Sequence, residues 1–411
     1  MKSALSRIAA ATVVGGVIAY LITWLVPRFL GFESYAEFSV FWGLLFFLVS
    51  ALSGIQQEIT RATRVRLPDE ERSASSAIAL GAAVAAGVAL ICAVTGPLWA
   101  DNLFPGFGIA LVWPIAVGAG SYAMLAVVGG TLYGIAAWNM LFWLISGEAV
   151  LRLALVSAAL FAGADTVVVA WAVAVPFPLT VLLLSPSLRR RIRRHATMDS
   201  GYSTVIGNVL RTIAAAASMG VIISGMPFVL GATSGGVDTE LFGLVVITMT
   251  LTRAPLIVVV MALQSYFIVL FKTASAPFAL LLRLGGAVLA GGVLLAAAGL
   301  ASGPWAFELL FPGEASPSSM LIAQFIVSSA LVAVMCLTGP LVLTRGAHWV
   351  YSGGWAAAAI VTIGLLLVPI GFVDRLLLAL YVGPAVGIAI HVGYLLARGF
   401  AGQVDTARAR S

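Results

Sequence analysis

The stretch LFGLVVITMTLTRAPLIVVVMALQSYFIVL, residues 241–270, is apolar almost throughout, yet it holds Arg253 and Pro255 near its centre. A helix that crosses a bilayer needs about 20 mostly apolar residues, so this stretch is long enough to span one. An arginine at the centre of such a helix costs about 2.5 to 3.5 kcal/mol on insertion scales, and Pro255 removes the backbone hydrogen bond to the carbonyl of Leu251. We therefore expect a membrane helix in which Arg253 makes an interaction that offsets these costs.

The composition of the whole chain agrees with this interpretation. Of its 411 residues, 61% are hydrophobic and only 9% are charged, and the mean hydropathy is +1.09. A soluble domain carries about 25% charged residues, so the chain is predicted to be a polytopic membrane protein. Cys92 and Cys336 both fall inside apolar runs, where we expect packing residues and no disulfide framework.

Apolar runs of spanning length recur along the chain and predict about twelve transmembrane helices. Their approximate limits are 8–26, 36–57, 76–96, 108–130, 140–162, 166–184, 208–231, 241–268, 276–300, 318–344, 350–372 and 376–397. The most polar segment expected on the inner side follows the sixth run and divides the chain into two halves. A division of this kind is typical of transporters built from repeated halves. We predict an all-α polytopic protein of two six-helix bundles around a central cavity: an N-terminal bundle 1–188, a basic cytoplasmic linker 189–206, a C-terminal bundle 207–400 and a tail 401–411.

The distribution of basic residues predicts the orientation. With the N-terminus inside, sixteen lysines and arginines fall in inner segments and two, Arg28 and Arg375, fall in outer ones. The inner set is Lys2, Arg7, Arg61, Arg64, Arg66, Arg72, Arg189, Arg190, Arg191, Arg193, Arg194, Lys272, Arg345, Arg398, Arg408 and Arg410. This positive-inside bias predicts that both termini are cytoplasmic.

The net charge of +6 is therefore interpreted as a topology signal, and no nucleic-acid partner is expected. The run RRRIRRH, residues 189–195, is best explained as an orientation determinant near anionic headgroups. Recruitment of an acidic headgroup or partner is the alternative for the same run.

Three short segments resemble a known family. The segments are RFLGFESYAEFSVFW at 28–42, SGIQQEITRATR at 53–64 and LTRAPLIVVVMALQSYF at 251–267. They resemble bacterial polysaccharide (Wzx-type) flippases of the multidrug/oligosaccharidyl-lipid/polysaccharide exporter (MOP) superfamily. Lipid II flippases that resemble this group usually carry two further helices, and the predicted runs here end at the twelfth. This difference favours an oligosaccharide-lipid flippase.

The resemblance implies a multi-pass protein of the bacterial plasma membrane, without enzymatic activity or cofactor. It would flip an undecaprenyl-pyrophosphate-linked oligosaccharide from the inner to the outer leaflet by alternating access, for cell-surface polysaccharide assembly. Expected partners are this lipid-linked oligosaccharide and membrane lipids, with a polysaccharide polymerase or glycosyltransferases as further candidates. Because guanidinium stays charged when desolvated and binds phosphate oxygens in pairs, Arg253 is a candidate for binding the pyrophosphate or for gating. The alternative is that Arg253 only holds helices together.

Other polar residues of the predicted spans have simpler explanations beside the functional ones. Glu148 and Arg152 lie four residues apart on one helix face and are predicted to form an intramembrane pair, which could open to release Arg152 to the substrate. Arg211 and Arg283 either extend to the inner surface or form the inner mouth of a cationic cavity. Three glutamines are candidates for sugar contacts, with interhelical hydrogen bonding as the alternative: Gln56, Gln57 and Gln264.

Other classes of function are also compatible with the sequence. A cation-coupled drug exporter of the same superfamily would be expected to hold an acidic ion site in its first bundle, whereas the mid-span acid found there, Glu148, lies beside Arg152. A membrane polysaccharide polymerase or ligase would need catalytic groups on a sizeable outer loop, and a scaffold role in an assembly complex is a further alternative. The sequence contains no metal-ligand cluster, nucleophile triad or phosphate-binding glycine loop, so no metal site is expected.

Overall fold

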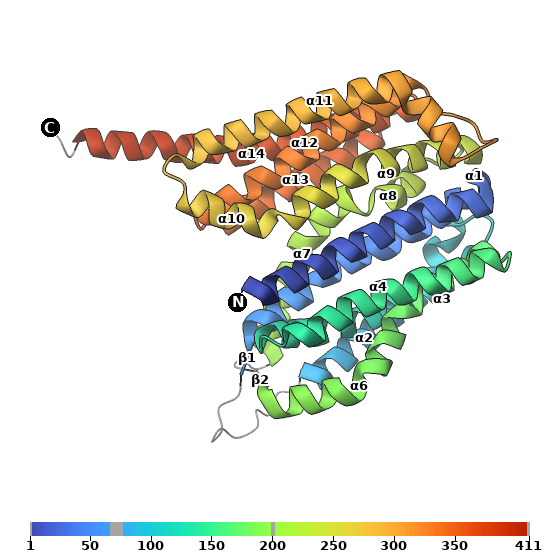
Figure 1. Ribbon diagram of the computed structural model, residues 1–411, viewed down its shortest axis with the longest axis horizontal. Coiled ribbons are helices and arrows are strands. Elements are labelled where there is room, and N and C mark those ends of the chain that lie inside the picture. The colour runs from blue at the N-terminus through green and yellow to red at the C-terminus, as the bar shows by residue number, and fades with distance from the viewer. Residues whose placement is uncertain (1, 66–76, 199–201, 409–411) are drawn as a thin grey trace. The chain divides into compact units, whose positions relative to one another are not determined.

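The computed structural model describes residues 2–65, 77–198 and 202–408, and these residues are helical almost throughout (Figure 1). The elements in chain order are α1 (Lys2–Ala62), β1 (Thr63–Val65), α2 (Ala77–Leu103), the 3-10 helix η1 (Gly108–Leu111), α3 (Val112–Gly134), α4 (Trp138–Phe161), α5 (Thr166–Ala174), α6 (Pro176–His195), β2 (Ala196–Met198), α7 (Tyr202–Ile223), α8 (Met226–Thr233), α9 (Thr239–Ala262), α10 (Gln264–Thr273), α11 (Pro277–Leu310), α12 (Ser319–Thr344), α13 (His348–Leu366) and α14 (Phe372–Arg408).

The first element, α1, contains two helices that run in opposite directions (Figure 1). They meet at Gly31, whose φ of 74° and ψ of 166° are not helical. A positive φ favours glycine because a side chain at that position would clash with the backbone. The two predicted runs 8–26 and 36–57 lie on either side of this reversal. α1 is therefore a helical hairpin that is long and apolar enough to cross a membrane twice.

The predicted fold class is confirmed. Within residues 2–65, 77–198 and 202–408, eleven helical segments are long and apolar enough to cross a membrane, and the first of them, Ala10–Ala62, contains the hairpin just described. Every predicted run falls on one of these segments. The junction between the predicted runs 140–162 and 166–184 is a turn, because Gly163 has a φ of 70° and Asp165 Oδ1 caps α5 by accepting a hydrogen bond of 2.9 Å from Val168 N.

Several predicted runs are broken helices. The run 208–231 is divided into α7 and α8 at Ser224 and Gly225, and the run 241–268 is divided into α9 and α10 at Leu263. A break in a membrane helix leaves backbone groups without their helical partners, so neighbouring groups must satisfy them. At the first break, Gly225 N donates to Gly220 O at 2.8 Å, and Ser224 Oγ donates to Phe46 O of α1 at 3.3 Å.

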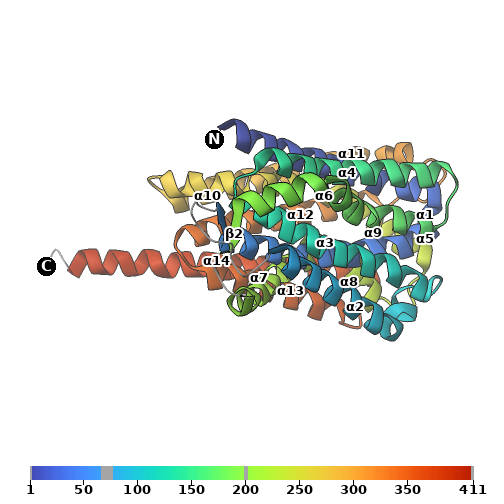
Figure 2. The same ribbon diagram turned by 90° about the horizontal axis from the view of Figure 1, so that it is seen from below.

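The chain divides into two compact units between Gly243 and Leu244. In the first unit, α1 packs against α3, α4, α7 and α8. Its buried face carries large side chains such as Phe38, Phe41 and Leu45. In the second unit, α12 packs against α10, α11 and α14, and α13 packs against α14. α14 continues towards the C-terminus beyond the ends of α12 and α13 (Figure 1 and Figure 2).

Glycines bring α7 and α8 unusually close to α1. A Cβ placed on Gly54 of α1 would lie 2.5 Å from Ile213 N of α7, and one placed on Gly43 would lie 2.6 Å from Phe228 N of α8. Such backbone approach is how helices associate in membranes, where burial of apolar surface gives little driving force. The contact also carries a hydrogen bond, because Thr212 Oγ1 donates to Gly54 O at 2.9 Å.

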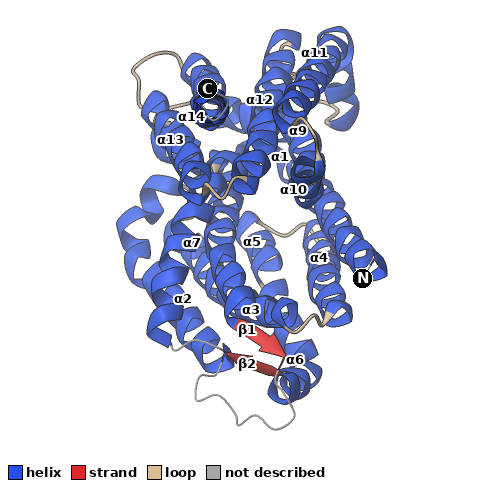
Figure 3. Ribbon diagram, turned by 90° about the vertical axis from the view of Figure 1, so that its left-hand side faces the viewer, coloured by secondary structure: helices blue, strands red, loops and turns tan. Residues whose placement is uncertain are grey.

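A short ribbon joins the ends of two spanning segments. Strands β1 and β2 pair in antiparallel fashion, with Arg64 opposite Thr197 (Figure 3). The ribbon rests on the end of α3, since a Cβ on Gly134 would lie 2.5 Å from Thr63 O. In the segment predicted as a basic linker, 189–206, the described residues form the last part of α6, β2 and the start of α7, and residues 199–201 lie outside the described residues. The predicted inner residues Arg66, Arg72 and Arg410 lie outside the described residues.

We predict that Gly54→Ala destabilises the protein by about 1 to 3 kcal/mol, because the added methyl meets α7 backbone that cannot move aside. The matched control is Gly207→Ala on α7, where an added Cβ meets nothing within 4 Å. That change should be neutral or stabilising, as alanine is the better helix former. Unfolding of the purified protein in detergent, by heat and by denaturant, measures both. Equal stability of the two variants would contradict the close contact.

We predict that cysteines placed at Arg191 and Asp238, in a chain with Cys92→Ser and Cys336→Ser, are labelled from opposite sides of the membrane. Arg191 lies near the end of α6, and one further crossing, α7 with α8, separates it from Asp238. The basic residues around Arg191 should lie inside. Labelling of whole cells and inverted vesicles with an impermeant maleimide measures the sidedness. Labelling of both sites from one side would overturn the predicted orientation.

Candidate functional site

The most elaborate charged site in the first unit is built around Arg152 of α4. Arg152 NH2 donates a hydrogen bond to Glu148 Oε1, one helical turn earlier. Only 7% of the Arg152 side chain and 13% of the Glu148 side chain are exposed. The structure thus brings together the two charges whose spacing suggested an intramembrane pair. A buried ion pair is tolerated inside a membrane because each charge offsets the desolvation of the other.

Two aromatic rings enclose the guanidinium. The Arg152 Cζ lies 4.9 Å from the ring centroid of Phe46 on α1 and 4.8 Å from that of Phe177 on α6. The Phe177 ring is in turn in edge contact with Tyr122 of α3, with centroids 5.5 Å apart. Cation–π contacts of this kind contribute about 2 kcal/mol when they are desolvated. Arg152 therefore connects α4 to α1 and α6, and its Nε has no hydrogen-bond partner among the described residues.

A second buried charge, Glu58, joins α1 to α7. Its side chain is 4% exposed, and it accepts hydrogen bonds from Arg61 Nε at 2.8 Å and from Arg61 NH2 at 2.5 Å. Asn208 Nδ2 of α7 also donates to Glu58 Oε1, at 3.0 Å. Glu58 was not among the site residues predicted from the sequence, although it lies in the segment 53–64. The three-residue spacing to Arg61 was the available signal, since residues three apart face one another on a helix.

The candidate sugar-contact residues have different environments. Gln56 is partly buried, and a Cβ on Gly129 of α3 would lie 3.2 Å from its Oε1, so Gln56 packs at the contact between α1 and α3. Gln57 is exposed. Gln264 begins α10 in the second unit, and its side chain hydrogen bonds with that of Tyr351 on α13.

The remaining candidate arginines lie in separate elements. Arg253 lies in α9 and is only 5% exposed, whereas Arg211 on α7 and Arg283 on α11 are both exposed. Of these three arginines, only Arg253 is buried. It lies two residues before Pro255, whose ring removes one backbone donor from the same helix.

A buried polar cluster surrounds His391 of α14. Its Nδ1 lies 2.8 Å from Thr338 Oγ1, its Nε2 lies 3.2 Å from Tyr351 O, and its ring stacks on that of Tyr351 at an interplanar angle of 5°. Cys336 Sγ and Met261 Sδ lie 3.8 Å apart nearby on α12 and α9. Among the described residues, no group of three or more His, Cys, Asp or Glu could hold a metal ion. Cys92 and Cys336 are both free and buried.

No protein-family model matches the chain. A Mycobacterium tuberculosis protein, "Uncharacterized protein Rv1510", is 30% identical over 404 residues, which cover 97% of this chain and 92% of the relative. A Mycobacterium bovis protein, "Uncharacterized protein Mb3654", is 29% identical over 403 residues, which cover 95% of this chain and 91% of that relative.

Solved structures with the same fold are transporters. An inward-facing multidrug resistance MATE family transporter of the MOP superfamily has a TM-score of 0.67 at 14% identity, covering 97% of this chain and 99% of that one. An outward-facing one has a TM-score of 0.61 at 16% identity, covering 96% of each chain. A MOP superfamily transporter from Pyrococcus furiosus, described as having a binding pocket of reverse polarity, has a TM-score of 0.62 at 15% identity, covering 96% of each chain.

We predict that Glu148→Gln and Arg152→Met each destabilise the protein by about 3 to 5 kcal/mol, because each strands one buried charge. The double variant should lose less than the two single losses combined, since it strands no charge. Arg152→Met keeps most of the side-chain volume between Phe46 and Phe177, so the cycle reports mainly on charge. Unfolding in detergent measures all four proteins. Additive losses would contradict direct pairing.

Proposed function

The chain belongs to the family that contains the mycobacterial relatives Rv1510 and Mb3654. From this membership and from its MOP transporter fold, we propose that it is an anion-carrying lipid flippase. Its substrate would be an oligosaccharide linked to undecaprenyl pyrophosphate, moved from the inner to the outer leaflet of the bacterial plasma membrane by alternating access. A polysaccharide polymerase and glycosyltransferases are the partners that such a step requires before or after it.

The observation that carries the proposal is the buried guanidinium of Arg253. It lies inside the spanning segment Thr239–Met261 and is 5% exposed. A cation at this position is costly for the membrane protein unless it serves an interaction worth the cost, and intramembrane charges are accordingly associated with substrate pathways. A pyrophosphate would supply about two negative charges and planar pairs of oxygen acceptors, which match the fork of N–H donors on arginine.

The carboxylates of the first unit support an anionic substrate over a cation-coupled drug. Both Glu58 and Glu148 are already hydrogen bonded to arginines, Arg61 and Arg152. A cation binding to either carboxylate would first have to displace its arginine. The reverse polarity described for the Pyrococcus furiosus transporter indicates that this fold accommodates binding pockets of different charge.

The energy source follows from the charge of the substrate. With the inside negative, the membrane potential contributes about 2.3 kcal/mol per charge per 100 mV to outward movement of an anion. It also favours inward return of an empty cationic site. The Glu148–Arg152 pair stays neutral, so it adds no charge to this cycle while it remains closed.

Multidrug export is the competing function, because two of the MOP transporters with this fold are described as multidrug resistance proteins. The two functions differ in the charge of the transported molecule. Purified protein in vesicles can be tested in parallel with a fluorescent lipid-linked oligosaccharide and with a cationic dye. Movement of the dye alone, driven by a proton or sodium gradient, would establish the exporter and reject the flippase.

We predict that Arg253→Ala lowers flipping of the labelled lipid-linked oligosaccharide by about 10- to 100-fold, as expected for loss of one charged hydrogen-bonding group worth about 1.5 to 3 kcal/mol. Arg253→Lys should restore part of the activity, since lysine keeps the charge without the planar fork. The control is Arg345→Ala, which removes an exposed arginine of the same unit that is not a candidate for substrate contact and should flip normally.

Thermal stability of each variant separates binding from folding in this experiment. Arg253→Ala should remain folded, because removal of a costly intramembrane charge favours insertion. Flipping by Arg253→Ala at the wild-type rate, or loss of flipping explained by unfolding, would leave Arg253 as a structural residue.

A further inference from the structure

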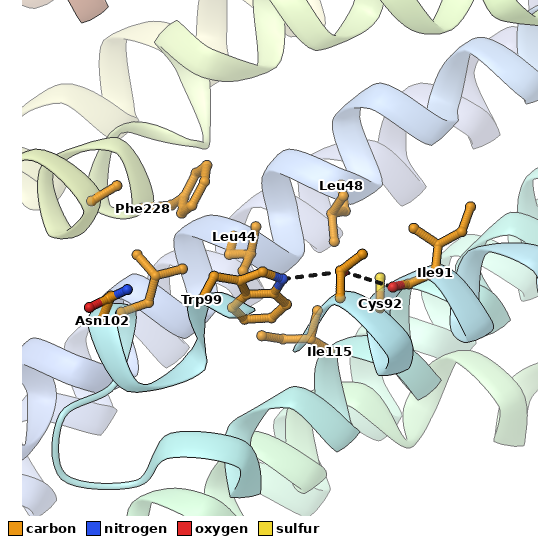
Figure 4. A pocket seen from close by; sticks show the side chains of 11 residues that line it. Leu44, Leu48, Ile91, Cys92, Trp99, Asn102, Ile115 and Phe228 are labelled. Atoms are coloured by element: carbon orange, nitrogen blue, oxygen red, sulfur yellow. Dashed lines mark hydrogen bonds between the residues drawn. The ribbon is translucent and has the colours of Figure 1, made fainter. Parts of the chain in front are cut away.

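A pocket of about 510 Å³ lies within the first unit, away from Arg152 and Glu58. Its walls come from α1, α2, α3 and α8, with Leu48, Ile115 and Phe228 among the apolar side chains that enclose it (Figure 4). This volume lies within the range of about 300 to 1,000 Å³ typical of small-molecule sites. Nothing in the function proposed above uses this pocket.

The polar atoms that line the pocket are largely satisfied by the protein itself. Thr95 Oγ1 donates to Ile91 O at 2.7 Å, and Trp99 Nε1 donates to Thr95 Oγ1 at 3.2 Å (Figure 4). These bonds run along α2 and leave mainly carbon atoms facing the interior of the pocket. Since water needs two to four polar partners to remain in a buried site, the pocket is suited to hydrocarbon.

The pocket extends along α2 for about the depth of one leaflet. Its lining begins at Leu103, where α2 ends, and reaches Ile91. At a rise of about 1.5 Å per residue this is roughly 18 Å, and half of a hydrocarbon core of about 30 Å is roughly 15 Å. Trp99 lies close to the same end of α2, as expected for a residue at the level of lipid headgroups.

The pocket is accessible from the bilayer. Ile91 forms part of its wall and is also 64% exposed, and its neighbours Val94 and Leu98 on α2 are 66% and 79% exposed. In a spanning helix, such residues face hydrocarbon. A lipid chain can therefore enter sideways from the membrane without crossing a polar barrier.

From these observations we infer that the pocket between α1, α2, α3 and α8 binds one acyl chain of a bilayer phospholipid, with the headgroup near Trp99 and Asn102. An acyl chain matches the depth of one leaflet, whereas a polyprenyl chain is much longer than this depth. The bound chain would contact α2 and α8 together. Because α8 follows the helix break at Ser224 and Gly225, the lipid would fix the position of the segment beyond that break.

Photocrosslinking tests the site directly. The probe is a phosphatidylglycerol with a diazirine on one acyl chain, incorporated into vesicles with the full-length protein. Crosslinks should concentrate on residues 91–103 and 226–233, and unlabelled phosphatidylglycerol should compete. Ala232→Phe fills the pocket and should reduce crosslinking about tenfold, since each excluded methylene weakens burial about fourfold. The matched control is Ala86→Phe, an exposed position of α2 outside the pocket lining, which should crosslink normally.

The native cysteines give a second measurement that does not depend on the filled variant. Cys92 lines the pocket, and Cys336 lies in the second unit. In Cys336→Ser protein in detergent, added phosphatidylglycerol should slow maleimide labelling of Cys92, whereas labelling of Cys336 in Cys92→Ser protein should not change. Crosslinks spread evenly over exposed helix faces, or equal crosslinking by Ala232→Phe and Ala86→Phe, would overturn the inference. Displacement of the probe by less undecaprenyl phosphate than phosphatidylglycerol would also overturn it, by assigning the pocket to a prenyl chain.

Discussion

The structure depends on one constraint: within hydrocarbon, each backbone N–H and C=O group must find its partner inside the protein. This explains why the described chain is helical almost throughout and why local hydrogen bonds form at each break in a spanning segment. At Leu263, the backbone ladder continues across the break, because Leu263 N donates to Val259 O at 3.2 Å and Phe267 N donates to Leu263 O at 3.0 Å. At Ser224, the side-chain hydroxyl donates a hydrogen bond to the backbone carbonyl of Phe46. At Ser224, the irregular backbone is thus stabilised by a contact between helices.

The buried charges follow the same logic. Glu58 is satisfied by Arg61 on its own helix and by Asn208 on α7, and Arg152 is satisfied by Glu148 and by rings from α1 and α6. In each case, the groups that offset the burial of a charge also join separate elements. The contacts that stabilise the buried charges are therefore also contacts that pack the helices together. Gly54 permits the contact between Glu58 and Asn208 by letting the backbones of α1 and α7 approach.

Much of the architecture could be predicted from the sequence, because apolar length and proline or glycine position are local signals. All twelve spans were located, and the reversal at Gly31 falls between the first two of them, yet the ribbon at Thr63 was not predicted, since it depends on which distant segments pair. The same limit applies to the candidate site. The four-residue spacing of Glu148 and Arg152 predicts contact within one helix, but nothing local indicates that Phe46 and Phe177 enclose the guanidinium. For Glu58, the spacing to Arg61 was a local signal, but nothing local indicates its contact with Asn208, which lies far along the chain.

The β1–β2 ribbon has a consequence for the synthesis of the protein on the ribosome. Val65 is paired with Ala196, so β1 must wait while α2 to α6 are synthesised and inserted. At about 5 to 20 residues per second, the intervening segment takes roughly 7 to 26 seconds to make. Throughout that interval β1 is an unpaired strand edge, which is a site open to wrong partners. Its brevity, three residues with Arg64 at the centre, limits this risk while the nascent chain grows.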